Sequence, residues 1–234
     1  LPNSGTDTLY AQWQINTVTL AYDPQGGTGQ PGNQTGIAAS NVTVSSTVPT
    51  RAGYTFTGWD AAANGSGTDY AGGDTYTLPN SGTDTLYAQW QINTVTLAYD
   101  PQGGTGQPGN QTGIAASNVT VSSTVPTRAG YTFTGWDAAA NGSGTDYAGG
   151  DTYTLPNSGT DTLYAQWQIN TVTLAYDAQG GSGEPGDQTG DAASNVTVSS
   201  TVPTRAGYTF TGWDTVANGS GTDYAGGATY TLPN

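Results

Sequence analysis

The chain of 234 residues is poor in charged side chains, at 9%, and its net charge is −14 because three arginines face 17 acidic residues. It contains no Cys, His, Met or Lys, which excludes soft-metal sites, thiol nucleophiles and Ser-His-Asp triads, and leaves little for general acid–base catalysis. We therefore expect no enzyme; the acidic balance disfavours nucleic acid as a partner, and no stretch is apolar enough for this segment to insert into a membrane.

An internal repeat of 77 residues organises the chain. Residues 1–77 and 78–154 are identical, residues 155–231 differ from them at eight positions, and the last three residues begin a fourth copy. A unit of this length can bury one small core and is longer than most solenoid repeats. We expect small domains in a row: residues 1–13 as the closing strand of a preceding repeat, then 17–90, 94–167 and 171–234, the last without its closing strand.

The first half of each repeat is predicted to hold extended segments separated by a loop. Alternating residues over 17–22 predict a strand, and Asp-Pro-Gln-Gly-Gly at 23–27 is typical of a turn. Residues 28–36 are rich in Gly, Pro and Asn and are expected to form a loop. Residues 37–41 fit either that loop or a helical turn, and residues 42–48 are expected to be extended.

The second half carries the stretch around which the unit is arranged, Arg-Ala-Gly-Tyr-Thr-Phe-Thr-Gly-Trp at 51–59. Its aromatic and Thr residues suit a pleated, half-buried strand. Strict alternation places Tyr54 and Phe56 on one side of that strand and Trp59 on the other.

Two more strands are predicted toward the end of each repeat. Asn-Gly at 64–65 indicates a turn, and alternating residues at 74–78 and 84–90 predict strands, the second with Leu86, Ala88 and Trp90 on one side. No segment has a long apolar period of 3.6 residues, so the fold class is mainly β with little helix. Only residues 91–94 separate the last strand of one repeat from the first strand of the next, which predicts a fixed relation between units and a rod.

Three blocks of each repeat together resemble the Listeria–Bacteroides repeat, a module related to the internalin B-repeat. They are Val-Thr-Leu-Ala-Tyr-Asp-Pro-Gln-Gly-Gly at 18–27, Pro-Thr-Arg-Ala-Gly-Tyr-Thr-Phe-Thr-Gly-Trp at 49–59 and Leu-Tyr-Ala-Gln-Trp at 86–90. The resemblance covers nearly the whole chain. It implies small β-grasp-like α+β modules and a place in secreted or wall-attached bacterial surface proteins, and it supplies no catalytic residues.

The regularly spaced aromatic and leucine side chains are predicted to form the structural core, because aromatics dominate the cores of small domains. The alternative is an exposed platform on which sugars stack. The predicted core residues are Tyr54, Phe56, Trp59, Leu86, Trp90, Tyr131, Phe133, Trp136, Leu163, Trp167, Tyr208, Phe210 and Trp213.

Two polar features have structural interpretations that we favour. Asp60, Asn64 and Asp69 could offer oxygen ligands to Ca²⁺, but their spacing fits no standard calcium loop, so a solvated turn is expected and no cofactor is predicted. Arg51, the one cation of its repeat, is expected to pair with a nearby Asp or to stack on an aromatic ring.

The two ends of the sequence are complementary. Residues 8–13 have the sequence of a closing strand, and the third repeat has none. One interpretation is that the sequence is a piece of a longer array. The other is that Leu9, Tyr10, Ala11, Gln12 and Trp13 of one molecule complete the third repeat of the next, head to tail.

The sequence thus predicts a structural segment of an extracellular bacterial stalk, adhesin or fibre at the cell surface. Its partners would be neighbouring repeats of the same protein, including self-association into filaments. The alternative function is a carbohydrate- or host-receptor-binding module that uses exposed aromatics.

Overall fold

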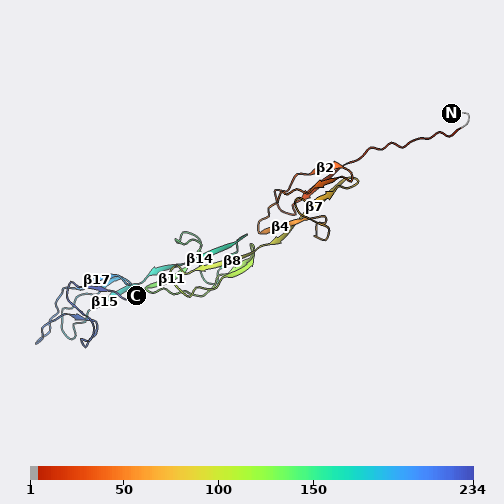
Figure 1. Ribbon diagram of the computed structural model, residues 1–234. Helices are drawn as coiled ribbons and strands as arrows, with labels where there is room; N and C mark the ends of the chain where they lie inside the picture. The colour runs from red at the N-terminus through yellow and green to blue at the C-terminus, as the bar shows by residue number, and fades with distance from the viewer. Residues whose placement is uncertain (1–4) are drawn as a thin grey trace. The chain divides into compact units, whose positions relative to one another are not determined.

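The computed structural model describes residues 5–234 (Figure 1). Within these residues it contains strands, turns and loops but no helix, and the strands recur in three tandem repeats. The predicted mainly β class is therefore confirmed, whereas the β-grasp likeness and the rod stay predictions. Contacts divide the chain into two compact units, one holding residues up to 96 with 112–117 and 154–160, and the other holding the remainder.

Each of the first two repeats contains seven strands in the same order. Those of the first repeat are β1 (Thr17–Asp23), β2 (Gln34–Ile37), β3 (Asn41–Thr43), β4 (Tyr54–Asp60), β5 (Asp69–Tyr70), β6 (Thr75–Thr77) and β7 (Thr83–Ile92). Those of the second are β8 (Thr94–Asp100), β9 (Gln111–Ile114), β10 (Asn118–Thr120), β11 (Tyr131–Asp137), β12 (Asp146–Tyr147), β13 (Thr152–Thr154) and β14 (Thr160–Ile169).

The third repeat contains shorter strands. They are β15 (Thr171–Leu174), β16 (Gln188–Asp191), β17 (Asn195–Thr197), β18 (Trp213–Asp214), β19 (Asp223–Tyr224) and β20 (Thr229–Thr231). They pair only two by two, as β15-β16, β17-β20 and β18-β19.

The last strand of a complete repeat is the central strand of its sheet. In the first repeat the order is β2-β1-β7-β4-β5, and the second repeat has the equivalent order. Strand β7 runs parallel to β1, with Tyr22 opposite Leu86, and antiparallel to β4, with Trp59 opposite Ala88. The two halves of the five-stranded sheet therefore meet only through β7, while β3 and β6 form a separate antiparallel pair.

Strand β2 corrects the expected loop. Residues 34–37 pair antiparallel with β1, although 28–36 were expected to be a loop and 37–41 a loop or helical turn. Side-chain bonds hold this edge: the Tyr22 hydroxyl donates to Gln34 Oε1 at 2.8 Å, and Gln34 Nε2 donates to the Thr43 carbonyl at 2.9 Å. The sequence around this strand is rich in Gly and Asn and does not predict it, because β-propensity reflects how side chains pack against neighbouring strands.

A β-bulge in β4 corrects the predicted sides of that strand. Phe56 faces Trp90 and Trp59 faces Ala88, and the register shifts between Phe56 and Gly58. Trp90 and Ala88 are two residues apart and share one face of β7, so Phe56 and Trp59 lie on the same face rather than on opposite faces. Gly58 has a φ of 150°, which glycine adopts readily.

The core of the first repeat lies on this shared face. Val18, Leu20 and Leu86 are fully buried around Trp59, which is 1% exposed. The Tyr22 and Phe56 rings stand edge-on to the Trp59 ring, with centroids 4.8 Å and 5.2 Å away. Such edge-to-face pairs add about 0.5–1.5 kcal/mol each beyond the burial of their area.

Candidate functional site

The closing strand fills the centre of each of the first two repeats. In β7 the side chains of Leu86 and Ala88 are buried, and Trp90 packs against Phe56 with ring centroids 5.6 Å apart. The indole Nε1 of Trp90 donates a hydrogen bond to the Pro24 carbonyl at 3.0 Å. This strand therefore joins the turn that follows β1 to the aromatic face of β4.

A glycine makes room for the Trp90 indole. A Cβ placed on Gly27 would lie 2.6 Å from the Trp90 ring and 2.9 Å from the Thr50 carbonyl oxygen. Gly104 has the same relation to Trp167 in the second repeat. The Gly-Gly of the predicted turn thus forms one wall of an indole pocket.

The other end of the closing strand is held by a tyrosine. The Tyr76 hydroxyl donates to Asp84 Oδ2 at 2.7 Å. Burial raises the pKa of the Tyr76 phenol, and the hydrogen bond to the Asp84 carboxylate raises it further. The same pair recurs as Tyr153 and Asp161. Sequence reasoning missed this contact, because nothing in the spacing of the two residues indicates it.

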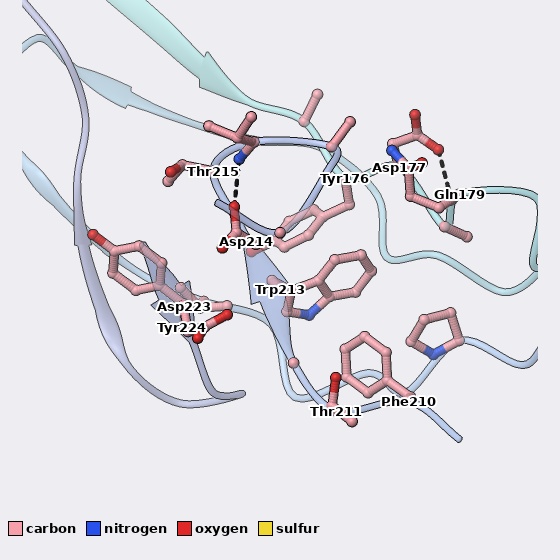
Figure 2. A pocket seen from close by; sticks show the side chains of 18 of the residues that line it. Tyr176, Asp177, Gln179, Phe210, Thr211, Trp213, Asp214, Thr215, Asp223 and Tyr224 are labelled. Atoms are coloured by element: carbon pink, nitrogen blue, oxygen red, sulfur yellow. Dashed lines mark hydrogen bonds between the residues drawn. The ribbon is translucent and has the colours of Figure 1, made fainter. Parts of the chain in front are cut away.

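In the third repeat, the described residues provide no strand at the position of β7, and a groove of about 580 Å³ lies there. Figure 2 shows the rings of Tyr176, Trp213 and Phe210 following one another along its wall. Their centroids are 4.9 Å apart for Tyr176 and Trp213, and 5.0 Å apart for Phe210 and Trp213. The groove is therefore the aromatic face that β7 covers in the first repeat.

The residues around this groove are less buried than their equivalents. Leu20 is fully buried in the first repeat, whereas Leu174 is half-buried. The Trp213 Nε1 atom is buried without a hydrogen-bond partner among the described residues. Strand β18 keeps only two residues where β4 has seven, since no neighbour pairs with residues 208–212. An added strand would satisfy backbone groups and cover apolar surface together.

The N-terminal segment has the complementary character. Residues 6–15 have the same sequence as β7, yet residues 5–16 form no strand and appear in Figure 1 as a plain extended trace. Leu9, Tyr10 and Trp13 are 99%, 80% and 92% exposed, and Ala11 and Gln12 are exposed as well. Residues 1–4 of the predicted segment 1–13 lie outside the described residues.

The predicted core residues lie together in the first two repeats. Trp59, Trp136, Leu86 and Leu163 are buried; the remaining members, Tyr54, Phe56, Trp90, Tyr131, Phe133 and Trp167, are half-buried. In the third repeat Phe210 and Trp213 are half-buried, but Tyr208 is 68% exposed. Its placement departs from the prediction because no closing strand lies beside it.

Of the three polar residues considered for calcium, Asp60 and Asn64 serve a turn and Asp69 lies in strand β5. Asp60 is fully buried, and its Oδ1 accepts hydrogen bonds from the backbone N–H groups of Ala62 and Gly67 at 2.5 and 3.0 Å. Asn64 accepts from Ser66, while Asp69 is exposed opposite Asp60 in the sheet. Within residues 5–234, no group of three or more His, Cys, Asp or Glu residues is arranged to hold a metal ion.

Arg51 stacks on an aromatic ring, which is one of the two contacts expected for it. Its guanidinium carbon lies 4.0 Å from the centre of the Tyr54 ring, and Nη1 donates to the Gln25 carbonyl at 3.2 Å. Arg128 and Arg205 stack in the same way on Tyr131 and Tyr208. The arginine thus ties β4 to the turn after β1.

Comparison with known proteins gives matches along the chain. Residues 19–89, 96–166 and 173–234 each match the model of the Listeria-Bacteroides repeat domain, which confirms the resemblance seen in the sequence. No helix in the described part of the chain is long and apolar enough to span a membrane.

Three relatives carry similar sequence. A "Putative Gly-rich membrane protein" of Evansella cellulosilytica is 36% identical over 174 residues, which are 70% of this chain and 19% of that protein. A "Putative membrane protein" of the same organism is 31% identical over 236 residues, 96% of this chain and 32% of that protein. Internalin H of Listeria monocytogenes is 36% identical over 160 residues, 64% of this chain and 25% of that protein. The chain therefore spans less than a third of the length of these relatives.

Proposed function

This chain belongs to the Listeria-Bacteroides repeat family, and we propose that it is a structural segment of an extracellular bacterial surface protein. Its work is mechanical: tandem β units project or link other parts of a stalk, adhesin or fibre. The family match and the similarity to Internalin H support the surface location. The named membrane proteins among the relatives are consistent with it.

The finer part of the proposal is that units join by strand complementation. Residues 8–13 of one molecule, within the longer segment 6–15, enter the groove of the third repeat of another molecule. The observation that carries this is that one repeat has an unfilled groove and that an exposed segment of the chain has the sequence of the strand that fills the equivalent position in the other two repeats. Repetition of such a head-to-tail contact gives a filament.

The occupied repeats provide the register. By equivalence with β7, Leu9 would take the buried position of Leu86, and Trp13 would take that of Trp90. Burial of a large apolar side chain contributes about 1.5–3 kcal/mol. Leu9 would gain this contribution in full and Trp13, in the half-buried position of Trp90, would gain part of it, while the backbone hydrogen bonds of the added strand would stabilise the joint further.

Three versions of the chain test the assembly. We expect the 234-residue chain to form linear oligomers whose mass grows with concentration in light scattering and sedimentation. A version without residues 1–15 lacks the strand, and a version with the sequence of residues 81–92 appended after residue 234 fills its own groove. Both should stay monomeric. If all three sediment as monomers at the highest concentration, the strand-complementation part of the proposal is wrong.

Glycan or receptor binding remains the second candidate, and exposed aromatics favour it. Trp13 and Tyr10 are exposed on an extended segment, whereas Trp59 and Trp136 are buried. Iodide quenching separates the two functions. In strand complementation Trp13 becomes protected as the protein concentration rises without any sugar. In glycan binding, protection requires the sugar and leaves the molecular mass unchanged.

A further inference from the structure

Consecutive repeats meet at an asparagine that follows each closing strand. The backbone N–H of Asn93 donates to the Gly53 carbonyl at 2.9 Å, and its Oδ1 accepts from Thr55 Oγ1 at 2.6 Å. Gly53 directly precedes β4 of the first repeat, and Thr55 lies within that strand. The asparagine is thus bonded to the repeat that it leaves.

The same asparagine is bonded to the repeat that it enters. Its carbonyl accepts from the Ala115 N–H at 2.9 Å, and its Nδ2 donates to the Asn157 carbonyl at 2.9 Å. Asn170 repeats the pattern: it donates to Gly130, accepts from Thr132 at 2.6 Å, and accepts from Ala192 at 2.8 Å. One residue therefore links two repeats through both its backbone and its side chain.

Close packing accompanies these bonds. Gly53 is buried, and a Cβ added to it would lie 3.2 Å from the Ala115 Cβ and 3.3 Å from Asn157 Oδ1. At Gly130 the corresponding distances, to Ala192 and Asn234, are both 3.0 Å. A glycine is needed here for its small size as well as for its φ of about 80°.

Each half of this junction recurs at one end of the described chain without the other half beside it. Gly207, the equivalent of Gly53, is exposed, and its Cβ position meets nothing within 4 Å. At the other end Asn16 is exposed, yet it already holds its own repeat: its Nδ2 donates to the Asn80 carbonyl at 3.1 Å and its carbonyl accepts from Ala38. Ala38 is half-buried, whereas Ala115 and Ala192 are buried.

We propose that a second copy of this chain docks with these two half-junctions as well as with the groove. This inference rests on the proposed strand complementation. Asn16 follows residue 15 as Asn93 follows Ile92, so a strand seated in the groove carries Asn16 to Gly207 of the other copy. There its N–H donates to the Gly207 carbonyl and its Oδ1 accepts from the Thr209 hydroxyl.

The second contact gives the joint a property that the strand alone lacks. An isolated strand fills the groove but leaves the two copies connected by a single extended segment. Bonds from Asn16 to both copies, together with the close approach of Gly207 to Ala38, would reproduce the contacts between consecutive repeats. The joint between copies then has the same structure as the joints within one chain.

A matched pair of chains measures this contact. The donor carries residues 81–92 again after residue 234, so that only its N-terminal segment is free; the acceptor lacks residues 1–15, so that only its groove is free. We expect Asn16→Ala in the donor and Thr209→Val in the acceptor each to weaken the Kd about three- to tenfold, the loss of one hydrogen bond. Both side chains are exposed, so both variants should fold. Thr197→Val is the control, because Thr197 is exposed on β17 and does not line the groove; it should leave the Kd unchanged.

The double variant decides the assignment. If the two groups bond across the joint, the donor and acceptor variants together weaken binding no more than either one alone. If the two factors in Kd multiply in the double variant, or if the single variants bind as tightly as the unmodified pair, the proposed Asn16 contact is wrong. Strand complementation would then still stand. No binding between the unmodified donor and acceptor instead overturns the proposed assembly itself.

Discussion

At the scale of single residues, a glycine is required at position 27 because the Trp90 indole packs against it, and not because of the turn in which it lies. No positive φ is needed at Gly27, but a Cβ there meets Trp90 at 2.6 Å and two carbonyl oxygens at 2.9 and 3.1 Å. We predict that Gly27→Ala destabilises the first repeat by about 1–3 kcal/mol, as overpacking does. Urea unfolding followed by tryptophan fluorescence measures the loss.

Gly32→Ala is the matched control, because the structure places nothing within 4 Å of a Cβ at that position. It should unfold at the same urea concentration as the unmodified chain. Equal midpoints for the Gly27 and Gly32 variants would show that the loop shifts freely and that the indole pocket is not tightly packed.

The bond from Tyr76 to Asp84 gives stability a dependence on pH. The pKa of Tyr76 is raised above its ordinary value of 10.0 in the folded chain, so the folded state holds the phenolic proton more tightly than the unfolded state. The contribution is complete below about pH 10 and is lost as the pH rises toward the folded-state pKa. We predict that the urea midpoint falls between pH 9 and pH 11, and falls less in Tyr76→Phe.

The phenylalanine variant should also be less stable at pH 8, by about 0.5–1.5 kcal/mol, because Asp84 loses its donor. Tyr22, Tyr99 and Tyr153 also have raised pKa values, so the variant keeps part of the fall. A pH profile identical in shape to that of the unmodified chain would refute the role given to Tyr76.

At the scale of elements, the sequence was sufficient where side chains alternate and insufficient where the backbone departs from alternation. The strand at residues 17–22 and the face shared by Leu86 and Ala88 follow from period-two patterns. Strand β2 has no such pattern, because its pairing depends on β1 and on the Tyr22–Gln34 bond. The bulge at Gly58 inverts the side of Trp59, and a strict period of two cannot express that inversion.

The candidate site could likewise be predicted only in part from the sequence. Comparison of the repeats with one another indicated a missing strand and a spare one. It could not indicate the Trp90 pocket or the Asn93 junction, since both depend on contacts between residues more than 35 positions apart. Long-range contacts of this kind leave no local pattern in one sequence.

Hydrogen exchange tests the state of β4 in the third repeat. Without a closing strand, residues 209–212 lack the pairing that β7 gives to residues 55–58, so we predict that their amides exchange faster. Peptides that reach Thr215 and Val216 differ in mass from those of the other repeats, which carry alanines there.

A synthetic peptide with the sequence of residues 82–92 should slow this exchange when added to the acceptor chain that lacks residues 1–15. The same peptide with its tryptophan replaced by alanine is the control and should protect the amides much less. Fast exchange that the first peptide leaves unchanged would mean that the groove does not take this strand.

At the scale of the whole molecule, the position of the last strand in the middle of each sheet makes neighbouring units interdependent. A repeat completes its five-stranded sheet only when residues 83–92 are inserted, and Asn93 then bonds directly to the next repeat. The strand that closes one unit is therefore followed at once by a residue that is bonded to the next unit. Nearest-neighbour coupling of this kind is what gives repeat arrays their stability.

Charge opposes the proposed association of whole molecules. Each copy carries a net charge of −14, and Asp177, Asp214 and Asp223 line the groove that the acidic N-terminal strand is to enter. The screening length falls from about 30 Å at 0.01 M salt to about 10 Å at 0.1 M, so added salt weakens the repulsion while leaving apolar burial in place. We predict that raising NaCl from 10 to 150 mM tightens the donor–acceptor Kd about three- to tenfold.

Sedimentation at both salt concentrations measures this change, and KCl at the same ionic strength should give the same result because screening does not depend on the cation. An affinity that falls with added salt would mean that attraction between charges holds the copies together. Attraction between charges is not expected, because each repeat has one arginine and that arginine stacks on a tyrosine of the same repeat. Salt should therefore strengthen the association, because it screens the aspartates that line the groove and leaves the apolar contacts of the strand in place.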